Sequence, residues 1–229
     1  MAELVVVGAA ELPAIGARWL AERAHAAIAA RGRFDVALAG GSTPRPIYET
    51  LATMDLPWSQ IHVWFGDERC VPPDHPDSNY RMARLALLDR VPAVAHRMEA
   101  DRPDREAAAA EYAAALPDVL DAMLLGMGED LHTASLVPGV DWGRPVGKKV
   151  IHVTGFPKPP PDRLTVTPDV IARARAILVA VAGAGKAGQV ALALTGPSRP
   201  DLYPIHLARR ATWLLDRAAA DKLQESPHV

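Results

Sequence analysis

The chain has one cysteine, Cys70, among its 229 residues, which excludes an internal disulfide and a cysteine-based zinc cluster. It lacks any apolar run near the ~20 residues that span a bilayer. Residues 1–8 lack the basic segment that opens a signal peptide. These absences predict a protein of a reducing compartment, and we expect it to be cytoplasmic and to have no membrane partner.

The sequence also lacks an excess of charge of either sign. It has 25 Lys and Arg residues against 27 Asp and Glu residues, a formal net charge of −2 with histidine neutral. Non-specific nucleic-acid binding needs a basic face, so we expect no nucleic-acid partner, and any anionic ligand must be held by local groups. The hydrophobic share of 49% and the charged share of 23% exclude disorder as the main state. The length predicts a single domain over residues 1–229.

Short apolar runs alternate with helical stretches along the chain. Strands are expected at residues 4–7, 35–39, 61–65, 119–125, 150–154, 176–182 and 212–215. Helices are expected at residues 12–31, from about 44, at 79–89, 104–115, 185–194, and from the last strand to about 224. Strands that are apolar throughout are buried on both faces. The pattern therefore predicts a doubly wound, Rossmann-like α/β fold: a mostly parallel sheet with helices on both faces.

Ligands of such folds bind beyond the carboxyl ends of the strands, where four polar or glycine-rich clusters of this sequence fall. The first is Gly40-Gly41-Ser42-Thr43, followed by Pro44 at the expected first helical position. Free backbone N–H groups at such a turn suit a phosphate, although an ordinary turn with a Ser or Thr cap fits equally well. The missing Gly-Lys-Ser/Thr ending excludes a Walker loop, and the missing Gly-x-Ser-x-Gly elbow argues against Ser42 as a nucleophile.

The second cluster is Asp67-Glu68-Arg69, with Asn79 beyond a polar loop at residues 66–78. Carboxylates beside an arginine can hold sugar hydroxyls and an anion, because the guanidinium fork makes paired hydrogen bonds with phosphate. The alternative is a solvated turn whose ion pair contributes little. The proline-rich run at residues 157–161 is expected to be a stiff surface connector.

The third cluster spans residues 124–136 and holds Asp130 and His132 at what is expected to be the start of a helix. Gly126-x-Gly128 is a dinucleotide fingerprint without its last glycine and far from the first strand, so we exclude NAD. Asp130 can orient the ring of His132, which titrates near neutrality. Most single histidines are structural, but the glycines and the carboxylate favour a catalytic base.

The fourth cluster is Gly183-Ala184-Gly185-Lys186. A lysine at a helix start is disfavoured by the helix dipole, and a bound anion would remove that conflict. The alternative is a lysine that faces solvent.

Together and in this order, the four clusters resemble the 6-phosphogluconolactonase family, part of a fold group shared with glucosamine-6-phosphate isomerases/deaminases. The resemblance covers residues 4–220. It implies a carboxylic ester hydrolase of the oxidative pentose phosphate pathway that converts 6-phospho-D-glucono-1,5-lactone to 6-phosphogluconate. No metal and no cofactor are implied, and we expect a monomer or small homo-oligomer.

The resemblance also implies residue roles. His132 is the implied general base, with Asp130 as the second catalytic residue. The other implied positions bind substrate: Gly41, Ser42, Thr43, Arg69 and Lys186 at the phosphate, Asp67 and Asn79, beside Asp130, at the sugar, and Gly40 with no assigned end of the substrate.

One departure concerns Leu131, which stands where the family has glycine between the Asp and the His. If its φ is positive, leucine costs about 1 kcal/mol or more and could tilt His132. If its φ is negative, leucine only adds bulk near the pocket. Leu131 is also the one feature that favours a non-catalytic sugar-phosphate sensor.

Two other enzymes remain as alternatives. In the isomerases/deaminases an acidic residue follows the histidine by five positions, and here that position is Val137. A serine or cysteine esterase would use Ser42 or Cys70.

Overall fold

The protein is built on a seven-stranded sheet in the order β1-β10-β9-β6-β2-β3-β5, here seen in a computed structural model that describes residues 2–142 and 147–223. Every pairing in this sheet is parallel. Its strands are β1 (Glu3–Val7), β2 (Phe34–Leu38), β3 (Ile61–Phe65), β5 (Val94–Ala95), β6 (Ala122–Leu125), β9 (Ile177–Val181) and β10 (Thr212–Asp216). β2, β6 and β10 are buried along their whole length, as expected of central strands covered on both faces.

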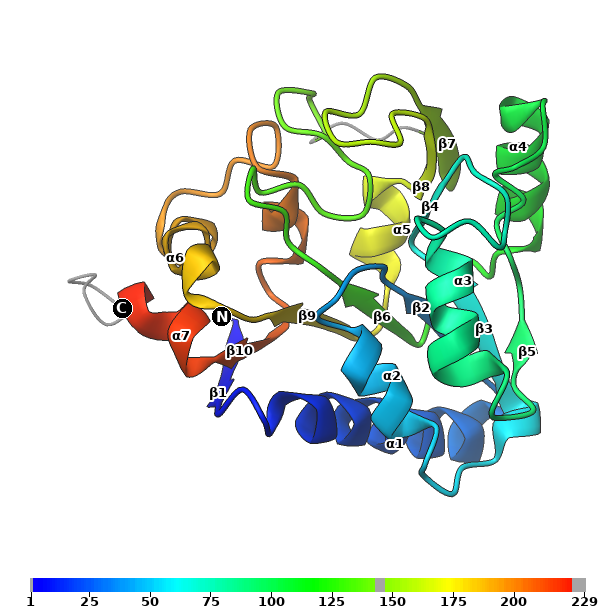
Figure 1. Cartoon of the computed structure of the whole chain (residues 1–229), viewed down its shortest axis with the longest axis horizontal. Helices are drawn as coiled ribbons and strands as arrows, with labels where there is room; N and C mark the ends of the chain where they lie inside the picture. Colours follow the sequence, from blue (N-terminus) through cyan, green and yellow to red (C-terminus); the bar gives the residue numbers. More distant parts are fainter. Residues whose placement is uncertain (1, 143–146, 224–229) are drawn as a thin grey trace.

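Helices follow most of these strands. They are α1 (Leu12–Arg31), α2 (Arg45–Leu51), α3 (Asn79–Ala83), α4 (Arg105–Ala115), α5 (Pro168–Arg173), α6 (Ala187–Thr195) and α7 (Arg217–Ala220). In the view of Figure 1, α1 and α2 lie below the strands and α5 lies above them. The predicted doubly wound α/β fold is therefore confirmed. Residue 224, the expected end of the last helix, lies outside the described residues.

A local signal accounts for the C-terminal end of the longest helix. α1 ends at Arg31, and the φ of +73° at Gly32, its C-cap, lets the Gly32 N–H donate to the Ile28 carbonyl. In the described part of the chain, no helix is both long and apolar enough to cross a membrane.

A second, antiparallel sheet has the order β4-β8-β7, with β4 (Asp67–Arg69), β8 (Arg163–Val166) and β7 (Val150–Val153). Three expectations from the sequence are wrong here. Residues 150–154 were expected in the parallel sheet, residues 67–69 were expected in a loop, and no strand was expected at β8. β4 is too short and too polar to show a strand period, and its pairing with β8 joins distant parts of the chain.

The chain order produces a crevice at the centre of the large sheet. From β2 the chain adds β3 and β5 on one side, and it then adds β6, β9 and β10 on the other. The strand order therefore reverses between β2 and β6, and at such a point the loops beyond the strands diverge and leave room for a ligand.

Candidate active site

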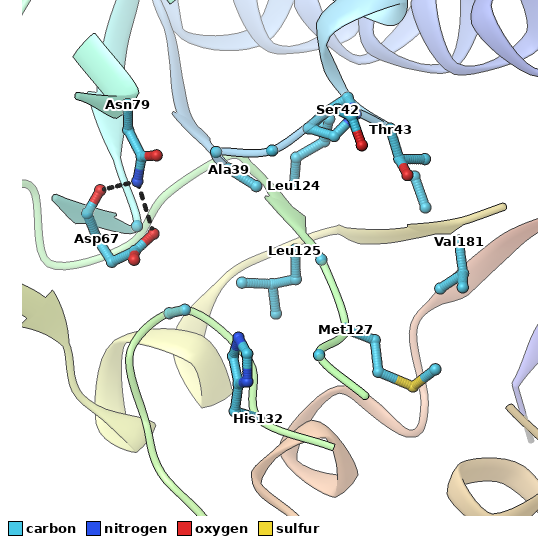
Figure 2. Close-up of a pocket in the computed structure, with 18 of the residues that line it drawn as sticks. Ala39, Ser42, Thr43, Asp67, Asn79, Leu124, Leu125, Met127, His132 and Val181 are labelled. Carbon is cyan, nitrogen blue, oxygen red and sulfur yellow. Dashed lines mark hydrogen bonds between the residues drawn. The ribbon is translucent and has the colours of Figure 1, made fainter. Parts of the chain in front are cut away.

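A cavity of about 350 Å³ opens at this crevice. It is bounded by residues that follow β2, β3, β6 and β9. The cavity brings together nine of the predicted site residues: Gly40, Gly41, Ser42, Thr43, Asp67, Arg69, Asn79, His132 and Lys186. Asp130 is not among the lining residues, but it contacts the His132 ring. Figure 2 shows His132 across the cavity from Ser42 and Thr43.

His132 and Asp130 form a close pair. His132 Nδ1 lies 2.5 Å from Asp130 Oδ1. An ionised carboxylate only accepts, so Nδ1 carries the proton and Nε2 keeps a free lone pair. Burial lowers the pKa of His132 and outweighs the opposing effect of Asp130. Burial also disfavours the charged form of Asp130, but the contacts with His132 prevail and hold its pKa below the ordinary value. At neutral pH, the imidazole is thus a neutral base.

The backbone around His132 is a tight loop and not the predicted start of a helix. Leu131 and Ala134 have φ values of +69° and +48°, which interrupt a right-handed helix. The loop is tied down by Thr133 Oγ1, which donates to the Gly126 carbonyl at 2.9 Å, and by the Leu131 carbonyl, which accepts the Ile205 N–H at 3.0 Å.

Leu131 therefore takes the costly one of its two predicted conformations. The left-handed backbone costs about 1 kcal/mol. The side chain is only 3% exposed, however, and burying a leucine contributes about 1.5–3 kcal/mol. Because the Asp130–His132 bond is intact beside it, leucine at this position has not turned the ring away.

Gly128 makes room for the pair. A Cβ at this position would lie 2.1 Å from His132 Nδ1 and 2.5 Å from Asp130 Oδ1. The glycine noted as part of a broken fingerprint is therefore required by the close approach of the imidazole.

The loop after β2 presents unpaired polar groups to the cavity. Gly41 has a φ of +106°, and α2 begins at Arg45 with Pro44 as its N-cap and no side-chain cap. The alternative of a Ser or Thr cap is therefore excluded, and the expected helical Pro44 is wrong, because the helix begins one residue later. Within the described residues, the Ser42 and Thr43 hydroxyls have no hydrogen-bond partner, and Figure 2 shows them on the cavity side.

Asp67 and Asn79 form the wall of the cavity next to Gly40 (Figure 2). Asp67 Oδ1 accepts from Asn79 Nδ2 at 3.1 Å, and its Oδ2 accepts from Ser135 Oγ at 2.7 Å. Asn79 is 2% exposed and its Oδ1 has no partner among the described residues. A Cβ on Gly40 would lie 1.8 Å from that oxygen, so glycine is required there too. The asparagine thus offers a spare acceptor beside the cavity.

Glu68 has a structural task instead. It accepts the backbone N–H groups of Arg69, Asn79 and Tyr80 and the Ser78 hydroxyl. Burial raises the pKa of Glu68, against the effect of these hydrogen bonds. The carboxylate therefore anchors the start of α3, and with it Asn79.

Four cationic side chains among the described residues line the cavity: Arg69, Lys158, Arg163 and Lys186. Lys186 Nζ donates to the Met127 carbonyl at 3.2 Å, and burial lowers the pKa of Lys186. Asp67 is the one carboxylate among the described lining residues, so the cavity favours an anion. No group of three His, Cys, Asp or Glu side chains in the described ranges is placed to hold a metal.

Sequence reasoning missed Lys158 and Arg163. Lys158 and Pro159 belong to the proline-rich run and line the cavity, so the interpretation of that run as a mere connector is wrong. The lysine within it was the available signal. Arg163 gave no signal, because only the pairing of β8 with β4 brings it to Asp67.

Comparisons with known proteins agree with this fold. A family model described as glucosamine-6-phosphate isomerases/6-phosphogluconolactonase matches residues 8–215. The 6-phosphogluconolactonase of Synechocystis sp. is 42% identical over 214 residues, which cover 86% of this chain and 88% of that protein. The solved 6-phosphogluconolactonase of Trypanosoma brucei has a TM-score of 0.83 at 29% identity, covering 97% of this chain and 99% of that one. A monomeric glucosamine-6-phosphate deaminase has a TM-score of 0.82 at 24% identity, covering 96% of this chain and 99% of its own, a likeness of fold alone.

Proposed function

The chain belongs to the glucosamine-6-phosphate isomerase/6-phosphogluconolactonase family, and from that premise we propose that it hydrolyses 6-phospho-D-glucono-1,5-lactone to 6-phosphogluconate. The observation that carries the proposal is a cavity with cationic walls and one carboxylate-bound imidazole. A phosphorylated lactone needs both: cations for its phosphate and a base for the water that opens the ester.

His132 is the general base in this proposal. Its free Nε2 takes a proton from a water molecule as the water oxygen attacks C1 of the lactone. A lactone is an activated ester, so no covalent enzyme intermediate is required. The imidazolium then returns the proton to the departing ring oxygen. Asp130 holds the ring in the required tautomer and stabilises the imidazolium, and general-base assistance of this kind is worth about 10²–10⁴-fold in rate.

The remaining site residues hold the substrate. Gly40 and Gly41 allow the loop its close approach, and the hydroxyls of Ser42 and Thr43 with the cations of Arg69 and Lys186 bind the phosphate. Asp67 and the spare acceptor of Asn79 receive sugar hydroxyls. Anchoring the distant phosphate supplies binding energy that fixes C1 against Nε2.

The other candidate activities have less support. The isomerase/deaminase reaction needs a further acid–base group, whereas Val137 occupies the position five residues after His132. Cys70 does not line the cavity, and burial raises the pKa of its thiol to about 11, so it is a poor nucleophile.

The test compares the wild type with His132→Asn in a pH-stat assay of lactone hydrolysis, corrected for the spontaneous reaction. We expect kcat to fall by about 10²–10⁴-fold while 6-phosphogluconate still binds. Near-normal turnover of the variant would remove His132 from the mechanism. Ammonia release from glucosamine 6-phosphate by the wild type would instead establish the deaminase activity.

A further inference from the structure

The segment between β7 and β8 lies against the catalytic imidazole. We call residues 156–161 the strap. The Phe156 N–H donates to the Pro161 carbonyl at 2.9 Å, so the strap is closed at its base. Phe156, Lys158 and Pro159 line the cavity. The strap therefore forms part of the wall beside His132.

Arg163, in β8, holds the strap from beneath. Its Nε donates to the Pro160 carbonyl at 3.0 Å, and its Nη2 donates to the Lys158 carbonyl at 3.0 Å. Its guanidinium carbon lies 3.8 Å from the centre of the Phe156 ring. The residue is 4% exposed, and its Nη1 lies 4.0 Å from Asp67 Oδ2. One planar side chain thus fixes the strap backbone and the Phe156 ring together.

Phe156 in turn packs against His132. The two ring centres are 5.1 Å apart at an interplanar angle of 85°, an edge-to-face contact. Phe156 is 4% exposed. The imidazole is therefore held by Asp130 at Nδ1 and by an aromatic ring that keeps water from part of its surface.

We propose that Arg163 is a positioning residue that acts on His132 through Phe156. The guanidinium stacks on Phe156 and ties down the strap, and the Phe156 ring fixes the orientation of His132 and keeps it desolvated. The catalytic meaning of this arrangement rests on the proposed function, but the effect on the His132 ring does not.

The environment of His132 makes this effect measurable. Burial lowers the pKa of His132, Asp130 and Asp67 raise it, and Lys158 lowers it. Arg163→Lys keeps the positive charge beside Asp67 while it removes the planar fork and the stacking surface. A rise in the pKa of His132 in that variant therefore reports the released strap, through lost desolvation and through the movement of Lys158 away from the ring.

The experiment titrates the His132 ring by NMR in the full chain, with its signal assigned by its absence in His132→Asn. In Arg163→Lys and in Phe156→Ala, we expect the pKa of His132 to rise toward the ordinary histidine value. We also expect kcat to fall by about 10²-fold with a smaller change in KM, because the residues proposed to bind the phosphate lie outside the strap. The matched control is Arg209→Lys: Arg209 also donates to a distant backbone carbonyl, that of Leu194, but lies outside the cavity lining.

The double variant Arg163→Lys/Phe156→Ala tests whether the two residues act on His132 together or independently. Since Arg163 acts through Phe156, this variant should shift the pKa of His132 no further than Phe156→Ala alone. A full additive shift, or an unchanged pKa in Arg163→Lys, would overturn the proposal. If the alanine variant does not fold, Phe156→Leu replaces it, because leucine keeps most of the burial of His132. In Phe156→Leu the pKa of His132 should stay near the wild-type value. A rise as large as in Arg163→Lys would refute the desolvation argument. If the wild type does not hydrolyse the lactone, the proposed function is refuted, but the titration still tests the effect of Arg163 on the His132 ring.

Discussion

Substitution of Gly128 by alanine should disable the His132–Asp130 pair by adding one methyl group. The new Cβ would lie 2.1 Å from His132 Nδ1, 2.2 Å from its Cε1 and 2.5 Å from Asp130 Oδ1. Ordinary contacts of a Cβ begin near 3.4 Å, so the imidazole must move by about 1.3 Å. The same methyl group also displaces the carboxylate, so both members of the pair must move.

The expected cost follows from that displacement. A misplacement of about 1 Å costs on the order of 10²-fold in rate, which corresponds to about 2.7 kcal/mol of transition-state stabilisation. Overpacking should also lower the free energy of unfolding by about 1–3 kcal/mol. KM should change little, because the residues proposed to bind the phosphate lie on other loops. The loss should therefore fall almost entirely on kcat.

The assay measures kcat and KM for lactone hydrolysis beside urea unfolding, for Gly128→Ala and for a control, Gly188→Ala. Gly188 lies in α6, and nothing lies within 4 Å of a Cβ built there. The control should keep its kcat and gain about 0.5–1 kcal/mol in stability, since alanine suits a helix better than glycine. If Gly128→Ala folds and turns over like the wild type, the geometry assigned to His132 and Asp130 is wrong.

Three further predictions concern the same loop. kcat/KM should be constant near pH 7 and should fall with decreasing pH through a pKa below the ordinary value of about 6.5. The reason is that burial lowers the pKa of His132 and only the neutral ring is a base. A pH-rate profile with its acid limb above that value would contradict this. Asp130→Asn should lower kcat by about 10²–10⁴-fold, because the amide favours the tautomer with the proton on Nε2; wild-type kcat in this variant would refute the assigned tautomer. Leu131→Gly should relieve about 1 kcal/mol of backbone strain, yet lower the free energy of unfolding by about 1–3 kcal/mol through lost burial. Its kcat should change little. A variant more stable than the wild type in thermal unfolding would show that strain dominates.

The parts of the site that follow strands directly were predictable. Gly40 to Thr43, Asp67 and His132 each lie just beyond an apolar run, and parallel strands bring such positions to one edge of the sheet. Features that depend on contacts between residues far apart in the chain were not predictable. The need for glycine at residue 128 follows from the imidazole packed against it, and the φ of Leu131 follows from the closure of its loop.

The strap shows the same limit. The pattern of residues 157–161 correctly indicated a surface segment, but not that it lines the cavity. That surface is set by β8, whose Arg163 reaches the strap carbonyls and Asp67 only after β8 has paired with β4. Antiparallel pairing between segments so far apart leaves no local period to detect.

The amino-acid sequence by itself determined the alternation of strands and helices, the parallel sheet and the set of polar loops at its carboxyl edge, because each depends on local hydrophobic order and on turn residues. The tertiary structure alone decided which face of His132 is covered, which carboxylate lines the cavity and which anchors a helix, and which cations share the cavity. Those properties depend on distances of a few ångströms between residues far apart in the chain, and only the packed fold sets such distances.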